Sequence, residues 1–361
     1  MRRFRLRSIA GALGLAVLAI APLPNARAHH VPSGPDHQAT EKDFAVEHFS
    51  VDSINVDNQF LPVPPGTTFT LTGTVGNSAH QVVFTVTELT KVVNGVRTQV
   101  LWDRDFNEGA LLEEELAFWA QDDFGNVWLF GEYPEEHAED GTVSAPSTWL
   151  AGIQEAAAGI LMRSNPKLNT PPYKQGEAPA VEFLDVAEVF AVDQQTCVPT
   201  GCYEGVLVID EHDPNQQPQD GHQFKYHAPG VGIIQVTARG GEDPETLVAT
   251  EHRTLTPEEL TEANARALEL DRRAYTMVPE VYGQTEPAVL RCEIPAPGTP
   301  PVVGPPAPRP PNAPPPLCPP PVPTPPTEVP PGNPPAGRPE RSRPTGEGRQ
   351  RSPQLFSVQR R

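Results

Sequence analysis

Side chains suited to metal binding or acid–base chemistry gather between positions 210 and 227. Three histidines, His212, His222 and His227, alternate there with aspartate and glutamate. Imidazoles and carboxylates are ligands of divalent transition metals and are also common general acids and bases. The intervening residues are rich in Asn, Gln and Pro, which is typical of a solvated loop. No cofactor is predicted, and a divalent metal at these three histidines is kept as the alternative.

Three tryptophans form the second candidate site. Trp102, Trp119 and Trp128 lie in consecutive segments with the composition of β-strands. On the concave face of a curved sheet, their rings could line a site for a small apolar ligand. Ordinary packing in a core is the alternative interpretation of all three.

Recognised catalytic signatures are absent from the sequence. It contains no Gly-x-Ser-x-Gly, no His-Glu-x-x-His, no P-loop and no Cys-x-x-Cys. Adjacent carboxylates, such as Glu113, Glu114 and Glu115, are interpreted as solvated faces of an acidic protein. We therefore predict a non-enzymatic binding or structural role. A metal-dependent or carboxylate-based hydrolase is the alternative.

The balance of charge excludes one class of partner. The chain has 46 acidic and 27 basic side chains, a formal net charge of −19. Nucleic-acid binding needs the opposite sign. No stretch is apolar enough for stable membrane insertion, because the N-terminal apolar run is too short to span a bilayer. The Arg- and Pro-rich C-terminal region could contact an anionic polymer of the cell envelope.

The N-terminus has the three parts of a secretory signal peptide. Arginines occupy positions 2, 3, 5 and 7, residues 9–23 are apolar, and Ala26-Arg27-Ala28 forms a cleavage site. We predict cleavage after Ala28 and a secreted, periplasmic or envelope location. The mature chain would then begin at His29, whose amine and imidazole could chelate copper.

Export places the four cysteines in an oxidising compartment. Cys197 and Cys202 flank Val-Pro-Thr-Gly, a turn sequence between two β-rich runs. Facing positions at the base of such a turn are close enough for a disulfide, which we predict here. The pairing of Cys292 and Cys318 stays open.

Hairpin signals dominate the body of the chain. The segments 81–90, 96–106, 111–121 and 127–133 alternate in polarity and are separated by turn residues that include Gly95, Gly109 and Gly125. The spacing places Trp119 and Trp128 opposite or nearly opposite each other. A helix is predicted at about 257–276, because Thr256, Pro257 and Glu259 form an N-cap, a first helical position and a capping box.

These elements predict a mainly β (α+β) fold. An antiparallel meander forms a curved sheet, one C-terminal helix packs against it, and a disordered Pro-rich tail follows. The chain divides into a signal peptide at 1–28, a flexible leader at 29–44, a β-rich domain at 45–292 and the tail at 293–361.

Two motifs resemble a group of uncharacterised exported bacterial proteins. One runs from Trp119 to Glu132, with the sequence WAQDDFGNVWLFGE, and the other from Tyr226 to Gly232, with the sequence YHAPGVG. The resemblance implies export and a β-rich fold but no activity. At the level of the fold, the pattern is also similar to lipoprotein-carrier folds, in which a curved antiparallel sheet wraps a helix.

Overall fold

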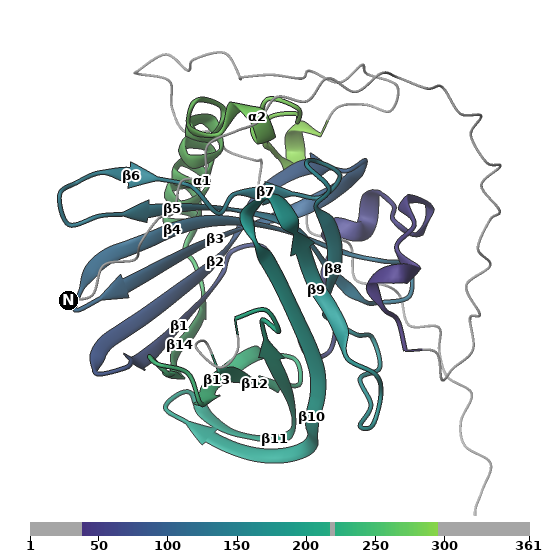
Figure 1. Cartoon of the computed structure of the whole chain (residues 1–361), viewed down its shortest axis with the longest axis vertical. Coiled ribbons are helices and arrows are strands. Elements are labelled where there is room, and N and C mark those ends of the chain that lie inside the picture. The colour runs from purple at the N-terminus through teal and green to yellow at the C-terminus, as the bar shows by residue number, and fades with distance from the viewer. Residues whose placement is uncertain (1–37, 217–220, 295–361) are drawn as a thin grey trace, which may run out of the picture. The chain divides into compact units, whose positions relative to one another are not determined.

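The structure, a computed structural model, describes residues 38–216 and 221–294 (Figure 1). Alternating polarity over short spans produces strands through most of this length. The strands are β1 (Thr67–Val75), β2 (Ser78–Val93), β3 (Val96–Asn107), β4 (Ala110–Gln121), β5 (Val127–His137), β6 (Val143–Ser144), β7 (Trp149–Leu150), β8 (Ala157–Met162), β9 (Tyr173–Ala178), β10 (Phe183–Val198), β11 (Gly201–His212), β12 (His222–Ala228), β13 (Gly232–Arg239), β14 (Glu245–Thr254) and β15 (Val289–Leu290). The helices are α1 (Pro257–Met277) and α2 (Pro279–Tyr282), with 3-10 turns η1 (Glu41–Asp43), η2 (Val46–His48), η3 (Val51–Ile54), η4 (Pro179–Val181) and η5 (Arg291–Glu293).

Twelve of the strands close into an antiparallel barrel. Their order around it is β1-β14-β13-β12-β11-β10-β9-β8-β5-β4-β3-β2, and β1 pairs with β2 to join the two edges. The short strands β6 and β7 pair with β5, and β15 pairs with β2. The mainly β prediction is confirmed, and the predicted curved sheet is a closed barrel, which leaves no free edge between its first and last strands.

The predicted meander corresponds to β2, β3, β4 and β5. Glycines at the three connections have positive φ angles, +78° at Gly95, +81° at Gly109 and +86° at Gly125. Only glycine adopts these angles without strain, which is why the turns fall at these positions.

The register across the β4–β5 turn differs from the predicted pairing of tryptophans. Trp119 pairs with Leu129, and Trp128 pairs with Ala120. Neighbouring residues of a strand point to opposite faces, so a register offset by one residue separates the two indoles. Trp119 faces the barrel interior, whereas Trp128 lies on the outer face.

The predicted helix is confirmed as α1. The Thr256 side chain accepts a hydrogen bond from the Glu259 amide, and the Glu259 carboxylate accepts one from the Thr256 amide, which completes the capping box. The helix packs on the outer face of β2 and β4 (Figure 1). Around its end, Tyr282 of α2 contacts the rings of Phe118 and Tyr133, so this part of the main core lies outside the barrel.

The described part of the predicted leader is packed against the barrel. Ala39 is only 7% exposed, and its carbonyl accepts a hydrogen bond from the Arg163 guanidinium. The Phe44 ring lies 5.6 Å from the Trp128 ring. Residues 38–44 therefore differ from the flexible segment expected, because this apolar and aromatic content covers the outer face of β5.

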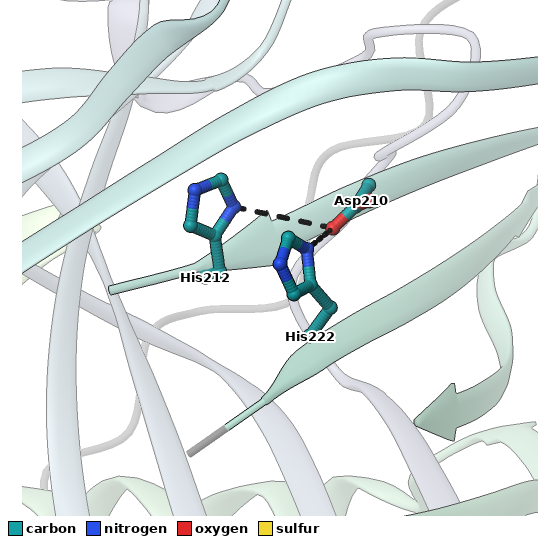
Figure 2. A group of neighbouring side chains, drawn as sticks. All are labelled: Asp210, His212 and His222. Carbon is teal, nitrogen blue, oxygen red and sulfur yellow. Dashed lines mark hydrogen bonds and ion pairs between the residues drawn. The ribbon is translucent and has the colours of Figure 1, made fainter. Parts of the chain in front are cut away.

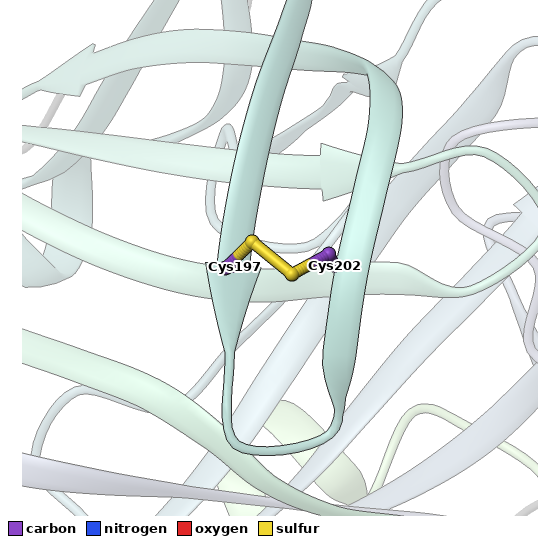
Figure 3. The surroundings of a disulfide bond; sticks show 2 residues. All are labelled: Cys197 and Cys202. Atoms are coloured by element: carbon purple, nitrogen blue, oxygen red, sulfur yellow. A yellow bond between two sulfur atoms is a disulfide. The ribbon is translucent and has the colours of Figure 1, made fainter.

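The disulfide between Cys197 and Cys202 is confirmed (Figure 3). The two residues face each other at the tip of the β10–β11 hairpin, with their Cα atoms 4.0 Å apart. Cys292 is also disulfide-bonded, and Cys318 lies outside the described residues.

Several predictions fall outside the described residues. They are the signal peptide at 1–28, the first part of the leader at 29–37 and the tail from 295 onward. Within the residues that the structure describes, no helix is long and apolar enough to cross a membrane.

Candidate binding site in the barrel interior

A cavity of about 220 Å³ lies inside the barrel. One part of its wall is apolar and includes Trp119, Leu129 and Phe183. The other part is polar, and its side chains come from seven strands. The polar lining residues are Asp103, Glu115, Glu132, Gln175, Asp185, Glu211, Lys225 and His227. The cavity thus combines a hydrocarbon surface with a concentration of carboxylates.

The register of the β3–β4 hairpin places carboxylates opposite each other. Asp103 pairs with Glu115, and Asp105 pairs with Glu113. Like charges at directly opposed positions of a sheet destabilise it. Two such pairs on the inner face therefore lower the stability of the fold. A bound cation, or protons retained on the carboxyls, would relieve this repulsion.

Burial holds protons on these carboxyl groups. Burial, reinforced by neighbouring carboxylates, raises the pKa of Asp103 and Glu115 well above the usual values. Burial and the charge of Glu211 raise the pKa of Asp185 to about 7. Burial and the charge of Asp105 raise the pKa of Glu113 to about 7. The interior therefore has an excess of acidic groups over basic partners.

Lys225 supplies one fixed positive charge to the cavity. Its ammonium lies 2.5 Å from Glu211 Oε2, and the Gln175 amide donates a 3.0 Å hydrogen bond to Glu211 Oε1. Burial lowers the pKa of Lys225, but the charges of Glu211 and Asp185 outweigh it and raise that pKa overall. This pair leaves the remaining cavity carboxyls without a basic partner of their own among the lining residues.

His227 presents a free nitrogen lone pair in this cavity. The residue is 3% exposed, and its Nδ1 donates a 3.1 Å hydrogen bond to the Phe60 carbonyl. Burial lowers the pKa of His227 to about 4, so the ring is neutral at pH 7. The other ring nitrogen, Nε2, is buried and has no hydrogen-bond partner among the described residues. A buried acceptor of this kind costs free energy unless a ligand donates to it.

The three candidate tryptophans occupy different places. Trp119 lines the cavity. Trp102 lies on the opposite face of the sheet, where its indole donates to Glu114 and stacks with Arg104. Trp128 packs under Phe44 and Phe49. They do not form one site, and only Trp119 stays a predicted ligand contact.

The three candidate histidines also separate. His212 and His222 stack with their ring centroids 4.3 Å apart and share the neighbour Asp210 (Figure 2). His227 lies in the barrel interior, on the other face of the sheet. A hydrolase centred on all three imidazoles would need them to converge, which they do not.

The acidic interior is not predicted from the sequence. Glu113 to Glu115 are predicted as a solvated run, whereas in the structure Glu113 and Glu115 face inward and Glu114 faces the helix, 3.5 Å from the Arg273 guanidinium. A detectable pattern was present in the hairpin. Asp103, Asp105, Glu113 and Glu115 alternate along two strands whose turn centres near Glu108, so all four fall on one face.

No protein-family description and no curated protein matches the sequence. Two solved structures are similar to it. One is a candidate exported protein with a YmcC-like fold from Bacteroides fragilis; the alignment covers 55% of this chain and 100% of that one. The other is a candidate lipoprotein from Parabacteroides distasonis, with 54% and 99% covered. Each has 12% identity to this chain and a TM-score of 0.31.

Proposed function

We propose that this chain is an exported, non-enzymatic binding protein that holds a small organic amine inside its barrel. The carrying observation is the cavity wall, which places several carboxylates opposite a hydrocarbon surface. An ammonium group would stabilise the ionised form of the cavity carboxyls, and the hydrocarbon part of the ligand would cover Trp119 and Phe183. Export rests on the signal-like N-terminus and on the disulfide at the β10–β11 tip.

The His227 ring supports an amine with N–H donors over a quaternary ammonium. Its buried Nε2 accepts and cannot donate, because Nδ1 carries the proton that bonds the Phe60 carbonyl. A primary ammonium has three donors, enough for this nitrogen and for neighbouring carboxylates. Aromatic rings beside the ammonium would add a cation–π attraction.

A matched set of ligands tests the charge requirement. We expect 2-phenylethylamine to bind the purified chain in isothermal titration calorimetry at pH 7.5, and 2-phenylethanol and 3-phenylpropionate to bind at least about 10-fold more weakly. The three compounds share a phenyl ring and differ in the polar group. Equal affinity for the alcohol and the amine would overturn the proposal.

Matched variants test the location. Asp185→Asn and Glu115→Gln remove a carboxyl that could ionise beside a bound ammonium, with almost no change in shape, and we expect each to weaken 2-phenylethylamine binding about 10-fold. Glu204→Gln is the control, because Glu204 is exposed on β11. Binding that is unchanged in both cavity variants would place the ligand elsewhere.

A further inference from the structure

A second group of potential ligands lies on the outer face of the barrel. Asp210 and His212 are two residues apart on β11, so they share a face, and Glu211 between them points to the interior. The β11–β12 register pairs Glu211 with Gln223, and its continuation sets His212 opposite His222. Figure 2 shows the two rings side by side, with Asp210 beside them.

The nitrogens of both rings are directed at one carboxylate oxygen. His222 Nδ1 lies 2.6 Å from Asp210 Oδ1, and His212 Nδ1 lies 4.0 Å from the same atom. All three ligand atoms lie within 4.8 Å of one another. Ligand atoms around a tetrahedral zinc ion, bound at about 2.0–2.2 Å, are separated by roughly 3.3 Å. The two nitrogen–oxygen separations, 2.6 Å and 4.0 Å, fall on either side of that value. Small side-chain shifts would therefore bring the three ligand atoms to tetrahedral spacing.

Burial separates this group from an ordinary surface cluster. Asp210 is 1% exposed, and its second oxygen lies 3.5 Å from the Arg239 guanidinium. The His212 and His222 side chains are 20% and 25% exposed, which leaves an approach from solvent. His212 Nδ1 is itself buried and has no hydrogen-bond partner among the described residues. An ion placed between that nitrogen and Asp210 would give the nitrogen a partner.

We propose that Asp210, His212 and His222 form a binding site for a divalent transition-metal ion, of which Zn²⁺ is the best fit. Two of the three ligands are imidazole nitrogens, a set that suits zinc and its neighbours and not the all-oxygen preference of calcium or magnesium. Three protein ligands leave the fourth tetrahedral position to water or to an external group. The site is independent of the amine site, because the two lie on opposite faces of β11.

Zinc titration of the metal-free full chain tests the proposal. The N-terminal histidines are potential chelators, so every protein carries His29→Ala, His30→Ala and His37→Ala. We expect one Zn²⁺ per chain by calorimetry, and tetrahedral absorption bands when Co²⁺ replaces it. His212→Ala and His222→Ala should each weaken binding at least about 100-fold, more than the 10- to 100-fold typical of residues that only support a ligand.

His252→Ala is the matched control, because His252 is exposed on β14 and stacks only on Phe69. It should bind zinc as the parent does. Circular dichroism melting of each variant establishes that the fold is retained, and Asp185→Asn should leave zinc affinity unchanged. Absence of binding at 100 μM Zn²⁺, or equal loss in His252→Ala and His212→Ala, would overturn the site.

Discussion

Asp122 organises the turn between β4 and β5 through four hydrogen bonds. Its Oδ1 accepts from the amides of Phe124 and Asn126, and its Oδ2 accepts from the Asn126 side chain and the Trp128 indole at 2.8 Å each. One buried carboxylate therefore satisfies donors from the turn and from the core. These contacts explain why Asp, Asn and Trp occur together in the WAQDDFGNVW segment.

The same turn yields a prediction for Gly125. Its φ of +86° is strained for any β-branched residue, and an added Cβ would lie 3.2 Å from the Ser164 side chain. We expect Gly125→Val to destabilise the protein by about 1–3 kcal/mol and to lower its melting temperature. Asp123→Ala is the control because Asp123 is exposed. Equal melting temperatures would contradict the assigned turn.

Short-range sequence patterns explain most of the helices and strands that were predicted, but they explain few of the long-range contacts. Turn glycines and polarity located the β2–β5 meander, and capping residues located α1, because each depends on neighbours in sequence. Closure of the barrel depends on β1 pairing with both β2 and β14. No short-range pattern reports such a pairing, so a curved sheet was the most that the sequence supported. The hairpin carboxylates follow a local alternation, but the other acidic residues of the interior, Glu132, Asp185 and Glu211, come from three further strands that no short-range pattern brings together.

The contact between α1 and β2 depends on a buried ion pair. Lys91 Nζ lies 2.9 Å from Asp271 Oδ1, 3.1 Å from the Tyr275 hydroxyl and 2.6 Å from the Glu286 carbonyl. The lysine also lies over the Tyr282 ring, 4.5 Å from its centroid. Burial lowers the pKa of Lys91, and the facing Asp271 carboxylate opposes that shift. The pair fixes the rotation of the helix on the barrel.

Removing one partner of this pair should be costly. We expect Lys91→Met to lower the free energy of unfolding by about 3–5 kcal/mol in urea denaturation, because it leaves the Asp271 charge buried. Adding Asp271→Asn should recover part of the loss, since the amide oxygen can still accept from the Ala288 amide, which lies 3.0 Å from Asp271 Oδ2. Arg272→Met, in an exposed pair with Glu269, should change little. A double variant less stable than Lys91→Met would argue against the pair.

At the scale of the whole molecule, the two faces of the barrel separate two chemistries. The inner face gathers carboxylates around an apolar wall, and the outer face holds the helix, the part of the core beneath it and the Asp210–His212–His222 group. Alternation along each strand produces this division, so a one-residue slip in register would exchange the two sets. Closure of the sheet holds the carboxylates close together. Their mutual repulsion therefore acts in the folded state and lowers its stability.

Burial of these carboxyls, reinforced by their mutual repulsion, predicts an unusual dependence of stability on pH. The pKa of Glu113 and of Asp185 is about 7 in the folded chain, above the ordinary values of 4.5 and 3.8. Between those limits the folded state binds more protons than the unfolded state, so stability falls as pH rises. His227 acts in the opposite sense, because its pKa of about 4 lies below the ordinary 6.5. Its contribution is complete above pH 6.5. His80, whose pKa is raised by its hydrogen bond with Glu245, acts in the same sense as the carboxyls as the pH rises above 6.5.

Urea denaturation at intervals across pH 6.5–8 measures this slope. We expect the free energy of unfolding to fall by on the order of 1 kcal/mol for each of the two groups, because both pass through their folded-state pKa within the window. The groups that face them are Asp105, Glu132 and Glu136 around Glu113, and Glu132, Glu211, Asp213 and Lys225 around Asp185. Glu113→Gln and Asp185→Asn should each flatten the slope, whereas Glu204→Gln should leave it unchanged. Stability that rises through this window, or a slope that neither cavity variant alters, would show that the interior carboxyls are already ionised at pH 6.5.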